Sequence, residues 1–467
     1  MTEQVSNWPP TYDDAYLPPA DARYWFPEIE TMAPTSREII IFEKLRGQTA
    51  WAYERSPFYQ RTWDAAGFHP SQLHALDDLH RIPVITKEDL RQDLLDNPPF
   101  GSNVCDDWAD IERIHGSSGT TGIPTVLTIS RDDWKRIGNA HARVMWAAGI
   151  RPTDMVFMAA PFSLYMGGWG ALVGAERIRA RCFPFGAGSP GQTRMAVRWI
   201  QAAHPTVFYG TPSFALYLAE TAREDGVDPR NLGFRVLFFS GEPGASIPGT
   251  RRVLEETYGA SVVDMGSTGE MSPWMSNGGC SESAGMHLWQ DIVYTELLDP
   301  ATHAVVPNGS EGVPVYTHLE RTSQPLIRFW SGDLSRWTDD PCPCGRTYPR
   351  LPMGIYGRVD DMVTVRGENV YPSAVENVVR GSVGLTGEFR VVITRERAMD
   401  ELTVLAEYAD PGAAGPALEA IRAGLQAELN TTLGIRANVQ MKAPGELERT
   451  QFKARRVIDE RNLYGSA

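Results

Sequence analysis

Cysteine and lysine are both scarce in this chain of 467 residues. Five cysteines in so long a chain exclude a disulfide scaffold, so a Cys-rich pattern here is interpreted first as a metal or catalytic site. Arginine is abundant, whereas lysine stands only at Lys44, Lys87, Lys135, Lys442 and Lys453. A lysine that falls inside a motif is therefore easy to single out.

Three further absences limit the class of protein. The formal net charge is −14 and there is no run rich in lysine and arginine, which excludes a nucleic-acid partner. No apolar stretch approaches the ~18 residues that a membrane span needs. The N-terminus lacks the basic and apolar regions of a secretory signal, so we expect a cytoplasmic protein without a membrane partner.

What is present has the pattern of a globular enzyme with two unlike parts. Short apolar runs at 155–161, 206–209, 236–239 and 261–264 alternate with helical patterns at 195–203, 213–224 and 248–258. This alternation predicts an α/β fold with a mainly parallel sheet, whose ligands sit at the carboxyl ends of the strands. Beyond residue 360 the pattern changes to a hairpin at 390–408, a helix at 417–429 and a strand at 438–442, which predicts a small α+β unit.

Residues 115–125 hold the most informative motif, His-Gly-Ser-Ser-Gly-Thr-Thr-Gly-Ile-Pro-Thr. Glycine lets the backbone turn its N–H groups toward one point, and Ser and Thr hydroxyls add donors around an anion. One interpretation is a loop that binds polyphosphate, and the other is an ordinary turn. The phosphate interpretation assigns the nucleotide contacts to Ser117, Ser118, Gly119, Thr120, Thr121 and Gly122.

Four more motifs follow in a fixed order, at residues 239–243, 264–270, 325–333 and 357–372. With the Gly/Thr loop they resemble the acyl-adenylate-forming (AMP-binding) enzymes, and most closely the phenylacetate-CoA ligase family, from about residue 40 onward. The resemblance implies a large N-terminal domain, residues 1–357, with mainly parallel sheets. It also implies a small mobile C-terminal lid domain, residues 358–467, that turns on a hinge near Asp360.

The resemblance further implies that ATP converts a carboxylate to an acyl-AMP, which the thiol of coenzyme A then attacks. Lys453 and Thr268 would be catalytic, together with Glu270, which would also hold Mg²⁺ because a hard cation prefers oxygen ligands. Asp333 would bond the ribose hydroxyls beside Arg358, and Gly367 would lie on the pantetheine path. Nucleotide contacts are also implied for Gly241, Glu242, Pro243, Asp264, Met265 and Gly266.

The chain departs from the family pattern at three places. Ile123 and Thr125 stand where the phosphate loop of relatives carries a lysine, so one mobile cation is missing. Around Met265 and Gly266 the family's tyrosine is absent, which removes an aromatic partner of adenine. Phe452 stands where a glycine often precedes the catalytic lysine.

Four further residues form a Cys₃His set, namely Cys280, His287, Cys342 and Cys344. Three thiols and one imidazole suit a closed, structural Zn²⁺ site, and similar segments occur in the phenylacetate-CoA ligase branch. The alternative is a group of small buried cysteines beside a core histidine.

Aromatic residues and glycine near the predicted strands suggest a flat pocket for the acid. The alternative is that these residues belong to the hydrophobic core. The candidates for the pocket are Phe162, Tyr165, Gly168, Tyr209 and Phe214.

We predict an aryl-acid:CoA ligase acting on a phenylacetate or substituted benzoate. A second hypothesis transfers the acyl group to a carrier-protein thiol, an amine or another small nucleophile, and a third is a non-enzymatic binding protein. The resemblance also suggests a homodimer.

Overall fold

The computed structural model describes most of the chain between residues 8 and 460. The described residues are 8–116, 125–164, 166–186, 192–266, 268–271, 276–282, 285–359, 363–365, 368–396, 399–449 and 456–460. Within these ranges no helix is both long and apolar enough to cross a membrane.

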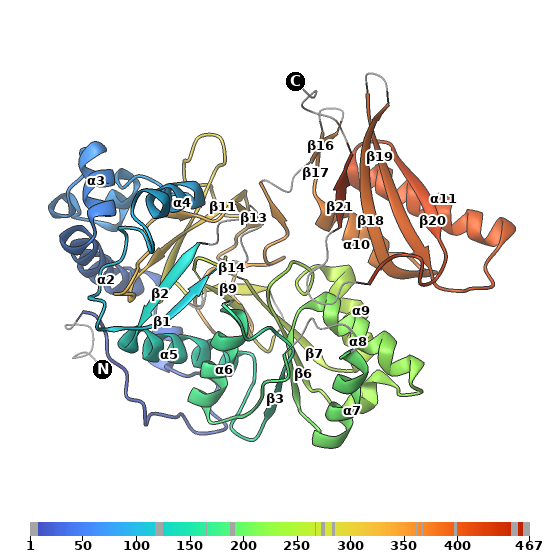
Figure 1. Cartoon of the computed structure of the whole chain (residues 1–467), viewed down its shortest axis with the longest axis horizontal. Coiled ribbons are helices and arrows are strands. Elements are labelled where there is room, and N and C mark those ends of the chain that lie inside the picture. The colour runs from blue at the N-terminus through green and yellow to red at the C-terminus, as the bar shows by residue number, and fades with distance from the viewer. Residues whose placement is uncertain are drawn as a thin grey trace.

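An eight-stranded sheet forms the centre of the large domain (Figure 1), in the order β14-β9-β8-β7-β6-β5-β3-β4. Five strands pair in parallel: β3 (Met155–Met158), β4 (Arg181–Phe183), β5 (Val207–Gly210), β6 (Val236–Phe239) and β7 (Ser261–Gly266). Three short strands extend the sheet in antiparallel fashion: β8 (Asn277–Gly279), β9 (Met286–Leu288) and β14 (Arg350–Leu351). The prediction of a mainly parallel α/β sheet is confirmed.

Helices cover both faces of this sheet, because successive side chains of a strand point to opposite faces. Tyr209 of β5 belongs to the buried cluster that includes Ile137 and Ala171, whereas its neighbour Phe208 packs with Leu218 and Leu254. The first face carries α5 (Arg131–Ala147) and α6 (Gly167–Ile178). The second carries α7 (Thr193–Ala203), α8 (Pro212–Glu224) and α9 (Pro248–Tyr258), with the 3₁₀ turn η3 (Pro229–Leu232).

Two smaller sheets complete the large domain. The first contains β10 (Val293–Leu298), β11 (Glu311–His318), β12 (Phe329–Trp330), β13 (Asp333–Arg336) and β15 (Gly357–Arg358). The second is the antiparallel hairpin of β1 (Ile111–Gly116) and β2 (Val126–Ser130), and the Gly/Thr loop connects its strands. The N-terminal region is helical, with α1 (Pro27–Glu30), α2 (Pro34–Arg55), α3 (Pro57–Ala65), η1 (Pro70–Gln72), η2 (Leu76–Arg81) and α4 (Lys87–Asp96).

The C-terminal domain is built on a four-stranded sheet of order β20-β19-β18-β21. The predicted hairpin, helix and strand are β18 (Leu385–Glu396) with β19 (Met399–Tyr408), α11 (Gly415–Leu433) and β20 (Ala437–Lys442). The remaining elements are β16 (Val363–Val365), β17 (Glu368–Val370), α10 (Pro372–Gly381) and β21 (Val457–Asp459). The expected α+β unit is therefore present.

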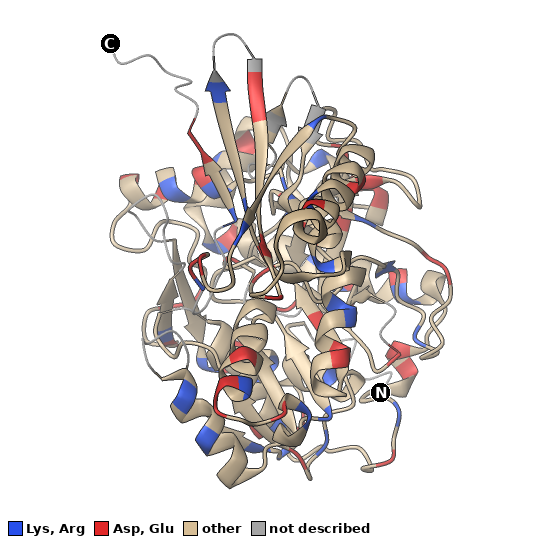
Figure 2. Ribbon diagram, turned by 90° about the vertical axis from the view of Figure 1, so that its right-hand side faces the viewer, with Lys and Arg blue, Asp and Glu red and all other residues tan. Residues whose placement is uncertain are grey.

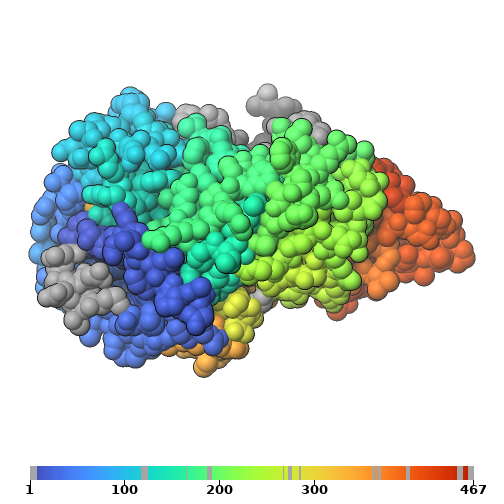
Figure 3. Space-filling model, turned by 90° about the horizontal axis from the view of Figure 1, so that it is seen from below, coloured from blue at the N-terminus to red at the C-terminus, as the bar shows by residue number. Residues whose placement is uncertain are grey.

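The two domains meet where α10 lies beside α9 (Figures 1 and 3). Gly249, in the first turn of α9, donates its N–H to the Asn377 side chain at 3.1 Å, and a Cβ at Gly249 would lie 2.9 Å from the Asn377 carbonyl oxygen. The guanidinium of Arg449 bridges the domains, bonding Glu407 of β19 at 2.7 Å and Glu220 of α8 at 2.9 Å. The absence of a side chain at Gly249 thus permits the close approach of α9 and α10, and these polar contacts stabilise it.

Candidate active site

Asp333 and Arg358 face each other on neighbouring strands. Asp333 pairs with Arg358 in the register of β13 and β15, and their side chains form an ion pair with Nη1 3.2 Å from Oδ1. Gly332 has φ +72°, and a Cβ there would lie 3.3 Å from Nη2 of Arg358. The structure therefore brings together, on a rigid ladder, the two residues that the sequence predicted for the ribose.

The loop after β6 contacts the start of α8. Gly241 has φ +95°, in the left-handed region that favours glycine. Glu242 accepts the backbone N–H of Ser213 at 2.7 Å, which satisfies one of the free donors at the helix N-terminus. Residues 241–243 thus follow directly on a parallel strand, at the edge of the sheet where ligands of α/β folds bind.

The end of β7 carries Asp264, Met265 and Gly266. Burial raises the pKa of Asp264 to about 7, against hydrogen bonds from Ser246 that lower it. A Cβ at Gly266 would lie 2.9 Å from Ile355 and 3.1 Å from the Met286 sulfur. The backbone conformation seen here leaves no room for the family's tyrosine at Gly266.

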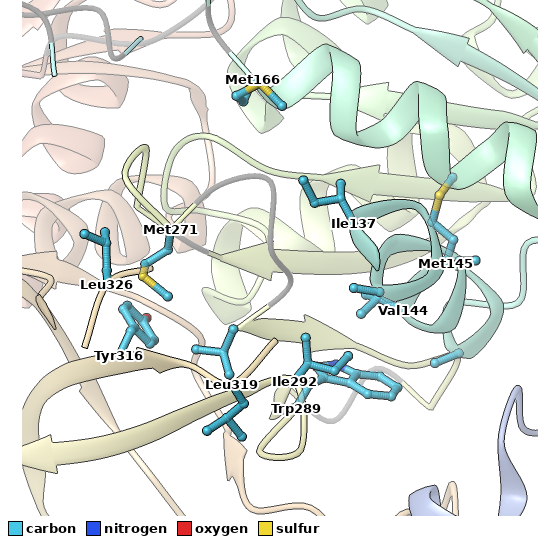
Figure 4. Packing of buried hydrophobic residues seen from close by; sticks show 14 of the residues in the cluster. Ile137, Val144, Met145, Met166, Met271, Trp289, Ile292, Tyr316, Leu319 and Leu326 are labelled. Carbon is cyan, nitrogen blue, oxygen red and sulfur yellow. The ribbon is translucent and has the colours of Figure 1, made fainter. Parts of the chain in front are cut away.

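Glu270 lies at the end of a short turn that the core holds in place. The Thr268 hydroxyl accepts the N–H of Met271 at 3.3 Å, and Met271 packs near Tyr316 and Leu326 (Figure 4). The fully buried Arg321 donates to the carbonyls of Glu270 at 3.5 Å and of Thr128, on β2, at 3.0 Å. Arg321 therefore joins the turn that carries Glu270 to the hairpin that carries the Gly/Thr loop.

The Glu270 carboxylate forms an ion pair that the sequence did not predict. Its Oε1 lies 2.8 Å from Nζ of Lys87, the first residue of α4, although the two residues are far apart in the chain. The Glu270 side chain is 5% exposed and the Lys87 side chain 43%. The scarcity of lysine was the available signal, but no local pattern linked Lys87 to this site.

One of the predicted pocket residues, Tyr209, makes a polar contact with Ser240, next to Gly241. Tyr209 is buried and its hydroxyl donates to the Gly167 carbonyl at 2.9 Å and lies 2.8 Å from the Ser240 hydroxyl. Phe162 packs edge-on against Trp169 with ring centroids 5.4 Å apart. A Cβ at Gly168 would lie 2.7 Å from the Pro161 carbonyl, so this turn requires glycine.

Phe214 lies on the other side of the sheet from Tyr209. It is 3% exposed and packs in the cluster of Phe208 and Phe239 under α7–α9. The structure therefore places Phe214 with the core residues of that layer and apart from Phe162 and Gly168.

Several predicted residues fall outside the described part of the chain, so the structure says nothing of them. They are Ser117, Ser118, Gly119, Thr120, Thr121, Gly122, Ile123, Tyr165, Asp360, Gly367, Phe452 and Lys453.

The four residues of the Cys₃His set converge. Cys280, His287, Cys342 and Cys344 are all buried, and their ligand atoms lie within 4.8 Å of one another. The Sγ atoms of Cys280 and Cys342 are 3.8 Å apart, and Sγ of Cys344 is 3.3 Å from Nε2 of His287. Tetrahedral zinc with Zn–S bonds of about 2.3 Å places two sulfurs about 3.8 Å apart, which matches this spacing.

The N-terminal segment covers this cluster. Tyr24 donates its hydroxyl to the Cys344 carbonyl at 2.9 Å, and a Cβ at Gly345 would lie 2.4 Å from the Tyr24 oxygen. The backbone N–H of Arg346 points to Sγ of Cys344 at 3.4 Å, and the Arg346 side chain pairs with the buried Glu30 at 2.8 Å. An N–H donor and a nearby guanidinium favour a thiolate at Cys344, as a metal ligand requires.

Comparison with known families decides the identity of this fold. Residues 72–315 match the model of the AMP-binding enzymes, and residues 367–461 match that of the AMP-binding enzyme C-terminal domain. The chain belongs to the AMP-binding enzyme family. It is 35% identical to a phenylacetate-coenzyme A ligase of Thermus thermophilus, over 93% of this chain and 98% of the relative. Like these relatives it is an AMP-forming acid–thiol ligase, which uses ATP to form an acyl-adenylate and coenzyme A to form the thioester.

Solved structures of a 2-hydroxyisobutyryl-CoA ligase are more similar in sequence. The postadenylation state of that enzyme with 2-HIB-AMP is 54% identical, covering 98% of this chain and 96% of that chain, with a TM-score of 0.94. The thioesterification state, with 2-HIB-AMP and CoA, is 55% identical at the same coverage, but its TM-score is 0.76. Because the identities differ by only one percentage point, the fall in TM-score reflects the arrangement of the domains and not the sequence, and the present structure resembles the postadenylation arrangement.

Proposed function

We propose that this AMP-binding enzyme activates a small branched hydroxy acid of the 2-hydroxyisobutyrate class and transfers it to coenzyme A. One observation carries the proposal: the chain is 54% identical to the ligase of that acid but 35% identical to a phenylacetate-CoA ligase. Both comparisons span nearly the whole chain, so the difference is not an effect of coverage. The pocket would then hold a short polar acid in place of the expected aromatic ring.

The polar contact at Tyr209 supports a hydroxylated substrate. The Tyr209 and Ser240 hydroxyls lie 2.8 Å apart beside the Gly241 loop, where they offer donors and acceptors to a substrate hydroxyl. Tyr209 is buried and already bonds the Gly167 carbonyl at 2.9 Å, so the half-buried Ser240 hydroxyl is the group that a hydroxy acid can bond and a benzene ring cannot. A site built to bond a hydroxyl rejects the analogue that lacks it by as much as about 10⁴-fold.

An aryl acid is the second candidate. The edge-to-face contact of Phe162 and Trp169 favours it, because such a pair can extend to a third ring. The test is release of pyrophosphate and AMP, and formation of the CoA thioester, with 2-hydroxyisobutyrate, isobutyrate, phenylacetate and benzoate. A kcat/KM highest for 2-hydroxyisobutyrate supports the first candidate. A preference for phenylacetate or benzoate overturns it in favour of the second.

The ATP site of the proposal uses Asp333 of β13, Arg358 of β15, and Thr268 and Glu270 of the turn after β7. Asp333 accepts hydrogen bonds from the ribose hydroxyls, and Arg358 holds that carboxylate in place. Thr268 donates to the α-phosphate from its fixed turn. Glu270 and Thr268 offer oxygen ligands that fit Mg²⁺, and the ion would neutralise charge on the phosphates when bound.

The second half of the reaction requires the small domain to move. We assign the hinge to Asp360, between residues 1–357 and residues 358–467, and the adenylating lysine to Lys453. The difference between TM-scores of 0.94 and 0.76 for two states of one relative supports such a motion. Acid-dependent pyrophosphate exchange tests the first half-reaction alone. If thioester or amide forms with a carrier protein or an amine but not with CoA, the acceptor assignment is wrong.

We also propose that the Cys₃His cluster holds a structural Zn²⁺. All four ligands are protein groups, so the ion would have no open position and would take no part in the reaction. Metal analysis of the purified protein should give one zinc per chain. Cys342→Ser should lower the zinc content and the melting temperature, whereas Cys182→Ser, at a half-buried thiol outside the cluster, should preserve the zinc. The assignment would be contradicted if the purified wild-type protein contained no zinc, or if removing zinc left its melting temperature unchanged.

A further inference from the structure

Lys87 brings a cation to the candidate active site through its ion pair with Glu270 at 2.8 Å, in a chain whose Gly/Thr loop has no lysine. We propose that Lys87 is a phosphate-binding residue, which leaves Glu270 and neutralises the β- and γ-phosphates when ATP binds. The inference rests on the proposed ATP site and adds a specific cation to it. The argument has three steps, which concern the position of Lys87, its freedom to move, and the lack of an equivalent cation.

The position of Lys87 follows from how α4 is anchored. Thr86 and Asp89 cap the helix reciprocally: Thr86 accepts the Asp89 N–H at 3.3 Å, and the Asp89 carboxylate accepts the Thr86 N–H at 2.7 Å. Ile85 is bonded through its backbone to Arg328 and Trp330 of the large domain. One turn after Lys87, Leu90 lines a small cavity together with Thr125, Val126 and Arg321. The helix therefore lines the same cavity as Thr125, the last residue of the motif at 115–125.

A lysine at this helical position is electrostatically unfavourable. The N-terminus of a helix carries partial positive charge, which favours Glu or Asp and opposes a cation. Lys87 stands at the first residue of α4, and acidic residues follow it at Glu88 and Asp89. A cation placed against the helix dipole is well suited to an anionic ligand, and the helix's own N–H groups would reinforce the attraction.

The side chain of Lys87 is free to change partner. It is 43% exposed while Glu270 is 5% exposed, so the lysine can turn toward solvent while the carboxylate stays within the site. A lysine ammonium is a point charge on a flexible stem, which can follow a phosphate that binds and then leaves. Glu270, once released, is available to Mg²⁺. The same movement would thus serve both groups.

The other described lysines pair with residues outside the predicted active site. Lys44 pairs with the buried Glu320, Lys135 with Asp132 on the same helix, and Lys442 with Glu446 in the small domain. Among the described residues, Arg358 is already paired with Asp333. Lys87 is therefore the lysine of the described chain that contacts a predicted active-site residue.

Binding of ATP and AMP by calorimetry tests the inference without knowledge of the acid. Lys87→Met should weaken the affinity for ATP about 10- to 100-fold, as expected for loss of a charge-assisted hydrogen bond, and leave the affinity for AMP within about twofold. The loss for ATP should persist when EDTA removes Mg²⁺, because the lysine acts on the phosphates directly. Lys135→Met, at an exposed lysine of α5, is the matched control and should change neither affinity.

A second variant tests whether Lys87 takes the place of the lysine that the Gly/Thr loop lacks. Ile123→Lys restores the loop lysine that relatives carry, and in the Lys87→Met background it should recover at least half of the lost ATP affinity on a logarithmic scale. Equal loss of ATP and AMP affinity in Lys87→Met, or a loss that disappears in EDTA, would overturn the inference. If the wild-type protein binds neither nucleotide, the proposed ATP site fails instead, so the two failures are distinguishable.

Discussion

Two ion pairs of the candidate site each join a carboxylate to a cation, but the backbone positions only one of them. Asp333 and Arg358 are register partners on neighbouring strands, so the backbone ladder sets their distance. Lys87 and Glu270 join an N-terminal helix to a turn of the central sheet, and only their side chains meet. We refer to these, after the ligands proposed for them, as the ribose pair and the phosphate pair. Ribose stays bound through both half-reactions whereas pyrophosphate leaves after the first, so a fixed pair suits one and an exchangeable pair suits the other.

The largest effect is expected at the ribose pair. Asp333→Asn removes the acceptor charge for two hydroxyls, and each charge-assisted hydrogen bond is worth about 1.5–3 kcal/mol. Acid-dependent pyrophosphate exchange should therefore slow by about 10²- to 10⁴-fold. Asp132→Asn, at an exposed carboxylate of α5, is the control. A loss below tenfold would show that the ladder position does not serve the nucleotide.

Glu270→Gln should give a smaller loss that depends on Mg²⁺. Loss of one carboxylate ligand should reduce the exchange rate about 10- to 100-fold at low Mg²⁺. The rate should recover as the concentration of Mg²⁺ rises, because a weaker site can still be filled by mass action. Asp333→Asn should not recover in the same titration. If both variants recover alike, the distinction between the two pairs is wrong.

Replacing each cation by the other type tests whether the Arg358 pair is fixed and the Lys87 pair is mobile. Arg358→Lys should cost about tenfold in kcat/KM for ATP, since a lysine cannot reproduce the planar fork that fits beside Gly332 and Asp333. Lys87→Arg should cost less than about threefold, since a mobile point charge tolerates another long cation. Steady-state kinetics of the two variants give the ratio of the two losses in kcat/KM for ATP. A larger loss at Lys87→Arg than at Arg358→Lys would reverse the comparison.

The smallest effect is expected at the domain interface, outside both pairs. Glu220→Gln removes the negative charge that Arg449 contacts on α8 but leaves the bond of Arg449 to Glu407, and an ion pair near the surface is worth at most about 1 kcal/mol. The free energy of unfolding should change by less than about 1 kcal/mol. Adenylation should slow a few-fold relative to thioester formation in single-turnover assays, because the postadenylation arrangement loses a contact. An unchanged ratio would show that this bridge does not bias the domains.

Much of the fold could be predicted because its signals are local. The strands at 236–239 and 261–264 are short apolar runs between helical patterns, and the structure places β6 and β7 there. The antiparallel strands β8, β9 and β14 have two or three residues each, which is too short for a period to show. The Cys₃His cluster was predicted from residue types, although its convergence depends on β8, β9 and the N-terminal cover.

The candidate site could be predicted in part for the same reason. Asp333 and Arg358 stand in motifs that carry their own signal, and the structure brings them together. Lys87 escaped prediction because nothing near it in the sequence indicates a partner 183 positions away. Phe214 and Tyr209 were grouped by aromatic character, whereas the alternation of side chains on β5 and the course of α8 separate them onto two faces. Substrate size could not be predicted, since it depends on how such faces pack.

The sequence by itself determined the family, the order of the motifs, the two-part architecture and the membership of the Cys₃His set, because each depends on residue type and on neighbours along the chain. The absence of a loop lysine was also evident from the sequence. Only the tertiary structure decided which cation meets Glu270, which aromatic candidates share a face of the sheet and which arrangement the two domains adopt. These depend on contacts between distant segments, whose geometry is set by packing and by the register of the sheets.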